Sequence, residues 1–174
     1  MIAHNCKHFQ REFSATPARP FHLVTSGLPN VYLAGVKYWV CRECDLQTVE
    51  IPAVKSLMFA IAECLVRKEG LLTGAEVRFL RKELGKKASD FAALINKTPE
   101  HFSKLENEQL PLTEDTDKLV RLTYTMLIGD KKLFSSLAEN AEQWLTSIQG
   151  NRKERILATR NRSLKAWKVS RKAA

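Results

Sequence analysis

The pattern of hydrophobic and polar positions changes near residue 53. Before it, residues 21–25 and 31–40 are runs rich in β-branched and aromatic side chains, and residues 26–30 between them have the composition of a turn. From residue 53 onward, apolar residues recur at the spacing of an amphipathic helix. The pattern therefore predicts a small antiparallel sheet followed by helices.

Helix start and stop signals divide the second part of the chain. A first helix is expected to end near Gly70, and Thr73 and Glu76 have the spacing of a capping box. Ser89 is expected to cap a short helix, and Pro99 is well placed at the first position of another. The predicted helices after the first one cover residues 73–85, 90–95, 99–108, 113–127 and 132–148.

Composition narrows the classes of protein to which this chain can belong. The 174 residues are 44% hydrophobic and 27% charged, an ordinary balance for a folded domain. No apolar run approaches the length of a membrane span, and the first residues lack the layout of a signal peptide. Four dispersed cysteines do not form the framework of a secreted domain. These features favour a cytoplasmic protein that does not contact a membrane.

The net charge of +9 is concentrated at one end of the sequence. Nine of the 28 basic residues and only one of the 19 acidic residues lie in residues 151–174. This segment therefore accounts for +8 of the net charge. We interpret it as a basic tail: either a flexible, solvated terminus or a segment that adds salt-dependent affinity for a phosphate backbone.

Two short predicted helices joined at Asn96 and Lys97 have the layout of a helix-turn-helix. Ala92 is small enough to let the helices approach, and Phe102 and Leu105 form the buried side of the second helix. A helical hairpin with a solvated polar face is the alternative. The side chains expected on the outer face of the second helix are Glu100, His101, Ser103, Lys104 and Asn107.

Three segments carry a resemblance to a known family. Residues 72–85 (LTGAEVRFLRKELG), 88–92 (ASDFA) and 102–107 (FSKLEN) closely resemble the Cro/phage-repressor (XRE) family. Within that family the chain looks like the MqsA (YgiT-type) branch: antitoxin-like regulators with an N-terminal zinc-binding domain and an XRE helix-turn-helix. The resemblance extends over residues 1 to about 128 and leaves the last helix and the tail unexplained.

The resemblance implies roles in DNA binding for individual residues. Lys87 and Ser89, at the start of the first helix of the pair, would contact phosphate, with help from the amides of that helix N-terminus. His101, Ser103 and Lys104 would reach base edges or nearby phosphates. The full predicted set is Lys87, Ser89, Thr98, Glu100, His101, Ser103, Lys104 and Asn107.

Some residues depart from the family pattern. The family often has arginine and then an aromatic residue where this chain has Lys104 and Leu105, and glycine where it has Glu108. Lysine keeps the charge but loses the bidentate fork that reads guanine. Glu100 and Glu108 also repel phosphates locally. The sequence preference of this chain is therefore expected to differ from the family's.

The cysteines suggest a structural zinc site. Cys41 and Cys44 form a CxxC motif after a β-type run, a common half of a tetrahedral zinc site. The family has a second CxxC near the N-terminus, where this chain has only Cys6, so His8 is the expected fourth ligand. His4 and His22 are alternatives, as is a metal-free knuckle whose sheet packs on the first long helix. Four protein ligands leave no open position for catalysis.

We therefore expect an α+β protein that is mainly α, with a small N-terminal antiparallel zinc-knuckle sheet, a five-helix XRE-type DNA-binding bundle and a basic tail. The expected units are a zinc-knuckle β domain (1–52), a linking helix (53–70), a helix-turn-helix domain with C-terminal helices (71–150) and the tail (151–174).

No catalytic motif is evident, so we do not expect an enzyme. The expected function is a sequence-specific, antitoxin-like repressor that binds double-stranded DNA in the bacterial nucleoid. The alternative is an interaction module that neutralises a toxin, with DNA binding secondary. A homodimer is expected because the last two helices offer more apolar residues than a minimal DNA-binding domain needs for its own core. These residues are Leu119, Leu122, Leu133, Leu137 and Trp144.

Overall fold

The computed structural model describes residues 10–150, 154–161 and 166–173. Within them it contains seven α-helices, one short 3-10 turn and two β-sheets. None of these helices is both long enough and apolar enough to cross a lipid bilayer. The helices are α1 (Val54–Val66), α2 (Gly74–Glu83), α3 (Ala88–Leu94), α4 (Pro99–Glu106), α5 (Glu114–Ile128), α6 (Lys131–Ala138) and α7 (Ala141–Ser147). The strands are β1 (Gln10–Ser14), β2 (Phe21–His22), β3 (Val31–Ala34), β4 (Lys37–Cys41), β5 (Gln47–Val49), β6 (Glu154–Asn161) and β7 (Ala166–Ala173).

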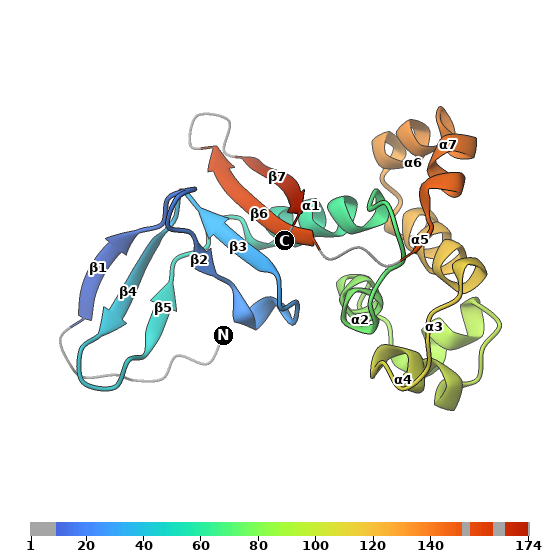
Figure 1. The fold of residues 1–174 in the computed structure, drawn as a ribbon, viewed down its shortest axis with the longest axis horizontal. Coiled ribbons are helices and arrows are strands. Elements are labelled where there is room, and N and C mark those ends of the chain that lie inside the picture. The colour runs from blue at the N-terminus through green and yellow to red at the C-terminus, as the bar shows by residue number, and fades with distance from the viewer. Residues whose placement is uncertain (1–9, 151–153, 162–165, 174) are drawn as a thin grey trace.

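The strands come from both ends of the described chain. One sheet has the order β1-β4-β5 and the other has the order β2-β3-β6-β7. Every pair is antiparallel except β3 with β6, which are parallel and set Val31 opposite Ile156. Asn30 fixes this register, because its side-chain amide donates to the Glu154 carbonyl and its own carbonyl accepts from the Ile156 amide at 2.9 Å. Figure 1 shows the two sheets on one side of the molecule and α2 to α7 on the other.

This architecture corrects the expected fold. A small N-terminal sheet, a five-helix bundle and a basic tail are not what the structure shows, because residues 154–161 and 166–173 form two strands of the larger sheet. Ile156, Ala158 and Trp167 are buried in the core, on the same face of β6 and β7. Arg155 and Lys168 alternate with the buried residues and are exposed, a pattern typical of a half-buried strand.

Several helix signals are confirmed. Thr73 and Glu76 form the expected capping box, and Thr98 caps α4, with Pro99 at its first position. Two expectations are wrong. The helix predicted over residues 132–148 is divided into α6 and α7, and Ser89 does not cap α3, which begins two residues earlier than expected, with Lys87 at the N-cap position.

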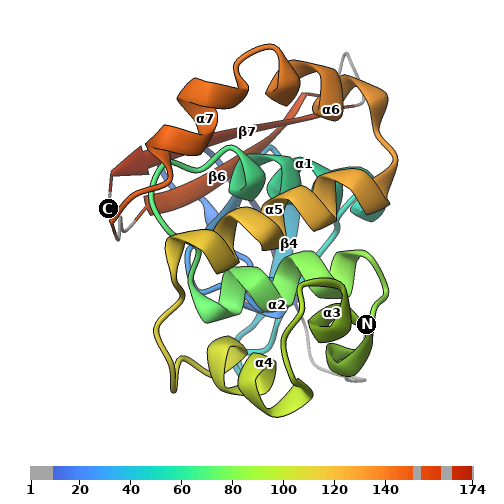
Figure 2. The ribbon, with the colours of Figure 1, turned by 90° about the vertical axis from the view of Figure 1, so that its right-hand side faces the viewer.

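Helix α1 connects the larger sheet to the other helices. Its buried residues Leu57 and Ile61 belong to the same hydrophobic cluster as Leu33, Ile156 and other residues of the sheet. The indole Nε1 of Trp167, on β7, donates to the Pro52 carbonyl at 3.1 Å, just before α1 begins. Figure 2 shows α1 lying against β6 and β7. The C-terminal hairpin is therefore part of the core that supports α1.

A buried ion pair joins α5 to the connection between α1 and α2. Arg121 and Asp117, one turn apart on α5, are both fully buried and hydrogen-bonded to each other. The Arg121 guanidinium also donates to the carbonyls of Val66, Lys68 and Gly70, while Asp117 accepts the Leu72 amide. One side-chain pair thus satisfies four backbone groups of the connection. This fixes α1 relative to the helices that follow it.

Candidate nucleic-acid interface and cysteine knuckle

Helices α3 and α4 pack against each other through two aromatic rings. Phe91 and Phe102 are fully buried, and their ring centroids lie 5.5 Å apart. In the turn between the helices Asn96 adopts a left-handed conformation with φ of 53°, and the Lys97 amide donates to the Ala92 carbonyl at 2.9 Å. Asparagine tolerates this conformation better than most residues. The expected short turn and the buried Ala92 are therefore both present.

Helix α4 presents polar side chains to solvent. Thr98 Oγ1 accepts the His101 amide at 3.2 Å, which ends the turn and starts the helix. Phe102 and Leu105 point into the core and fix the rotation of α4 about its axis. The side chains left exposed by this rotation are Glu100, His101, Ser103 and Lys104. The structure thus brings the central members of the predicted DNA-binding set onto one exposed face.

Helix α2 holds the C-terminal end of α4 by a close backbone approach. A Cβ atom built on Gly74 would collide with the carbonyl oxygen of Leu105 and would lie 2.8 Å from that of Glu106. Both obstacles are backbone atoms, so neither can move without shifting α4. The glycine in the LTGAE segment therefore permits the contact that supports the polar face.

Gly74→Ala should lower the free energy of unfolding by about 1–3 kcal/mol, because the added methyl group forces two backbones apart. Urea denaturation of the two proteins measures this directly. Gly85→Ala is the matched comparison, since open space surrounds its Cβ position and its positive φ of 65° is the only source of strain. A Gly74→Ala protein as stable as the parent would mean that α2 and α4 are not packed this closely.

Two arginines of α2 reinforce the same contact. Arg81 forms a two-pronged ion pair with the buried Glu106 carboxylate, at 2.7 and 2.9 Å. Arg78 donates to the Glu106 carbonyl at 2.9 Å and to the side-chain oxygen of Asn107 at 2.6 Å. The side-chain nitrogen Nδ2 of Asn107 in turn donates to the Ser103 carbonyl at 2.8 Å. In this structure Asn107 therefore links α2 to the end of α4, although its side chain remains exposed.

The predicted phosphate contacts lie on the neighbouring helix. Lys87 is the exposed N-cap residue of α3, and Lys86 beside it is also exposed. The Ser89 hydroxyl is 3.0 Å from a carboxylate oxygen of Asp90, so its expected phosphate contact competes with an existing hydrogen bond. The lysines bring positive charge to this end of the helix pair, and Asp90 partly offsets it.

The CxxC motif forms a turn between β4 and β5. Cys41 is buried and Cys44 is exposed, and the Glu43 amide donates to Cys41 Sγ at 3.4 Å. Asp45, directly after the motif, has a positive φ of 53°. In the β1–β4 ladder Gln10 lies opposite Cys41, so the described chain begins at the end of the sheet that carries this turn. An amide that donates to sulfur suits a thiolate, as a zinc ligand must be.

Of the other candidate zinc ligands, the structure describes only His22. Cys6, His8 and the alternative His4 lie outside the described residues. His22 is on the other sheet, where its Nε2 is hydrogen-bonded to the Pro29 carbonyl at 2.9 Å and its ring stacks on Tyr32. Over residues 10–150, 154–161 and 166–173 no three histidine, cysteine or carboxylate side chains cluster as metal ligands would.

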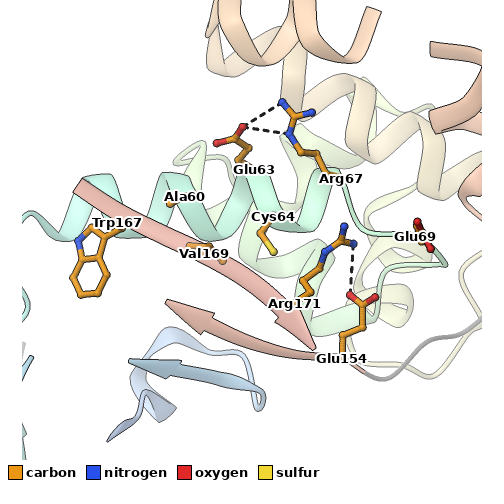
Figure 3. A pocket seen from close by; sticks show the side chains of 9 residues that line it. All are labelled: Ala60, Glu63, Cys64, Arg67, Glu69, Glu154, Trp167, Val169 and Arg171. Carbon is orange, nitrogen blue, oxygen red and sulfur yellow. Dashed lines mark hydrogen bonds and ion pairs between the residues drawn. The ribbon is translucent and has the colours of Figure 1, made fainter. Parts of the chain in front are cut away.

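Cys64 faces a cavity between α1 and β7 (Figure 3). The cavity has a volume of about 570 Å³, and its polar lining includes the ion pairs Glu63–Arg67 and Glu154–Arg171. Burial is the main cause that raises the pKa of the Cys64 thiol to about 11. At neutral pH this cysteine is therefore a protonated, weakly nucleophilic thiol, as is usual for a buried cysteine that packs as a small hydrophobic residue.

Sequence reasoning missed an aromatic and basic stack on the larger sheet. His22, Tyr32 and Arg155 come from three different strands, and Arg155 lies 133 positions from His22 in the sequence. No local spacing could bring them together, because the parallel pairing of β3 with β6 does so. The short apolar run Ile156-Leu157-Ala158, flanked by polar residues, was the available signal that the segment is a strand.

Comparisons with protein-family models, with curated proteins and with solved structures found no match for this chain.

Proposed function

We propose that α3 and α4 form the helix-turn-helix of a regulator that binds double-stranded DNA, with α4 in the major groove. The observation that carries the proposal is the exposed face of His101, Ser103 and Lys104 on a short helix held from three sides. Phe102, Gly74 and Arg81 provide those three supports. A rigid helix with short polar side chains is suited to contact base edges without further ordering.

Charge at the edge of the helix pair supports contacts with the phosphate backbone. Lys86 and Lys87 are exposed next to α3, and Lys82 is exposed near the end of α2. Lysine side chains bind phosphates as point charges and release counterions from DNA. Glu100 and Glu108 are exposed on or beside α4 and oppose close approach to phosphates. The lysines therefore position the helix pair, while His101 and Lys104 provide discrimination.

The proposed regulator is a homodimer that acts in the cytoplasm on chromosomal DNA. Helices α5 and α6 carry large apolar side chains that are exposed in the single chain. Leu133 and Leu137, expected at the interface, are instead buried within the chain. The exposed residues, which fit a second copy of the chain better, are Leu119 (44%), Leu122 (39%), Met126 (70%) and Phe134 (53%).

Selection from a pool of random duplexes tests this function and would reveal the operator sequence in the same experiment. A dimeric helix-turn-helix protein should enrich two related half-sites whose centres are about 10 base pairs apart, one helical turn. Enrichment of a single half-site would retain DNA recognition but contradict the dimer. Failure to enrich any motif would contradict the proposal and make a protein partner the leading function for the chain.

A structural zinc ion is also proposed, held by Cys41 and Cys44 together with Cys6 and His8. The Cys41–Cys44 turn and its amide–sulfur hydrogen bond fit a tetrahedral thiolate site. Gln10, which lies opposite Cys41, is within four residues of both remaining ligands in the sequence. The zinc ion would join the start of the chain to the end of the smaller sheet.

Purified protein should contain one zinc ion per chain, and Cys44→Ser should abolish this binding. Chelation should lower the melting temperature by roughly 5–10 °C, since about 2–3 kcal/mol of stabilisation corresponds to that shift in a chain of this size. His8→Ala and His4→Ala distinguish the two candidate fourth ligands. Cys64→Ser is the matched cysteine control and should retain full zinc content. Protein without zinc but with an unchanged melting temperature would favour the metal-free knuckle.

A further inference from the structure

The larger sheet has one face covered by α1 and one face open to solvent. Trp167, Val169 and Arg171 of β7 lie on the α1 side, as Figure 3 shows. Because side chains alternate along a strand, the residues between them point to the opposite side. Lys168 and Ser170 are accordingly exposed. We call this opposite side the open face of the sheet.

Three side chains form a stack across the open face. The rings of His22 and Tyr32 are 4.7 Å apart and nearly parallel, with an interplanar angle of 18°. The Arg155 guanidinium lies over the Tyr32 ring at 3.8 Å from its centroid. Both His22 and Arg155 are exposed, while Tyr32 between them is half-buried. The hydrogen bond from His22 to the Pro29 carbonyl fixes the orientation of the imidazole ring.

The open face has positive charge without a described carboxylate. Lys168 is opposite Thr159 in the β6–β7 ladder, and Arg155 lies on the neighbouring strand β6, with both side chains exposed. The acidic residue of β6, Glu154, alternates to the α1 side, where it lies 3.6 Å from Arg171. The described side chains on the open face are His22, Tyr32, Ala34, Arg155, Leu157, Thr159, Asn161, Ala166, Lys168 and Ser170, of which Ala34 is buried, and none of them is acidic.

We propose that the open face binds single-stranded nucleic acid. Arg155 and Lys168 contact the phosphates, and an unpaired base stacks on the side of the His22 ring that faces away from Tyr32. An exposed sheet that combines cations with stacked aromatic rings matches the two chemical features of a single strand, a polyanionic backbone and flat bases. Stacking on Tyr32 holds the Arg155 guanidinium in place, so little side-chain freedom is lost on binding.

This interaction does not depend on the proposed duplex binding by α4. A duplex keeps its bases paired and stacked, so it cannot offer a base to His22. The two binding activities therefore require different residues on different elements, and variants of one surface should leave the other activity intact.

Fluorescence anisotropy of the full chain with a labelled single-stranded oligodeoxythymidine of about 12 nucleotides tests the proposal. Arg155→Gln/Lys168→Gln should raise the Kd roughly tenfold and lower the slope of log K against log salt by about 1.4, the contribution of two phosphate contacts on a single strand. His22→Ala should weaken binding of oligodeoxythymidine about fivefold. It should leave binding of an abasic strand of the same length unchanged.

The matched control is Lys131→Gln/Lys132→Gln, which removes two exposed charges from α6. This control and the α4 variant His101→Ala/Lys104→Ala should both bind the single strand as the parent does. All five substituted positions on the open face and α6 have exposed side chains, so the variants should fold, which their circular dichroism spectra would verify. The proposal is overturned if the control loses as much affinity as Arg155→Gln/Lys168→Gln. Equal binding of the abasic strand and oligodeoxythymidine by the parent would also overturn it.

Discussion

Arg121→Met should lower the free energy of unfolding by about 3–5 kcal/mol, one of the largest effects expected for a substitution away from the apolar core. Arg121 and Asp117 are both fully buried, and the substitution leaves the Asp117 carboxylate without its partner charge. It also removes the guanidinium donors to the carbonyls of Lys68 and Gly70, whereas the Val66 carbonyl keeps the hydrogen bond from the Trp144 indole. Buried polar groups that lose their partners keep the full cost of desolvation.

Urea denaturation followed by circular dichroism measures this loss. Arg67→Met is the matched control, because Arg67 also pairs with an acidic residue one turn away, Glu63, at 3.2 Å. Both of those side chains are about one-third exposed, so the control should change stability by less than about 1 kcal/mol. Equal losses for the two variants would show that the Arg121 pair does not stabilise the connection between α1 and α2.

His101→Ala/Lys104→Ala should abolish the preference for specific duplex DNA while leaving the fold intact. Each base contact contributes about 1–3 kcal/mol of discrimination, so removal of two should reduce specific affinity by at least about 30-fold. Both side chains are exposed on α4, so the free energy of unfolding should change by less than about 1 kcal/mol. The variant should still bind shuffled duplex DNA, because Lys86 and Lys87 remain.

The measurement is the Kd for a selected duplex and for a shuffled duplex of equal length, determined for parent and variant. Lys131→Ala/Lys132→Ala, on the exposed surface of α6, controls for the loss of positive charge. If the α4 variant and this control reduce affinity for both duplexes equally, α4 contributes only charge and does not read sequence.

The local elements are predictable because their signals lie within a few residues of each other. The capping box at Thr73 and Glu76 and the start of α4 at Thr98 and Pro99 depend on hydrogen bonds and steric preferences inside one turn. The rotation of α4 is also predictable, since Phe102 and Leu105 occupy one side of the helix. The exposed face of the candidate DNA interface is therefore visible in the sequence.

The long-range pairings are not predictable in the same way. Nothing near β6 indicates that it pairs with β3, because that pairing depends on the register between Val31 and Ile156 across the whole chain. The charge of the C-terminal segment also obscures its strand character: Arg155 and Lys168 alternate with residues that are buried. The stack on the open face follows from this pairing and cannot be recognised without it.

The site also uses some residues differently from the sequence expectation. Asn107 is expected from the sequence to contact DNA, yet its side chain links Arg78 to the Ser103 carbonyl. That role depends on the close approach of α2 to α4, which is possible because Gly74 has no Cβ atom to collide with the α4 backbone. A short polar side chain at a helix end gives the same sequence signal for both roles.

Point variants test DNA recognition better than truncation does. A chain ending at Gly150 would lose β6 and β7 and with them the buried side chains Ile156 and Trp167. Any change in its DNA binding would then be confounded by loss of the sheet that supports α1.

The most direct test of the central claim compares two duplexes with the intact chain. One is the fragment upstream of the gene that encodes it, and the other is a shuffled fragment of the same composition. Anisotropy titrations across a salt series should give at least about tenfold tighter binding to the upstream fragment near physiological salt, and His101→Ala/Lys104→Ala should remove that difference. Equal Kd values at every salt concentration, for parent and variant alike, would contradict the assignment of α4 as a helix that reads DNA sequence.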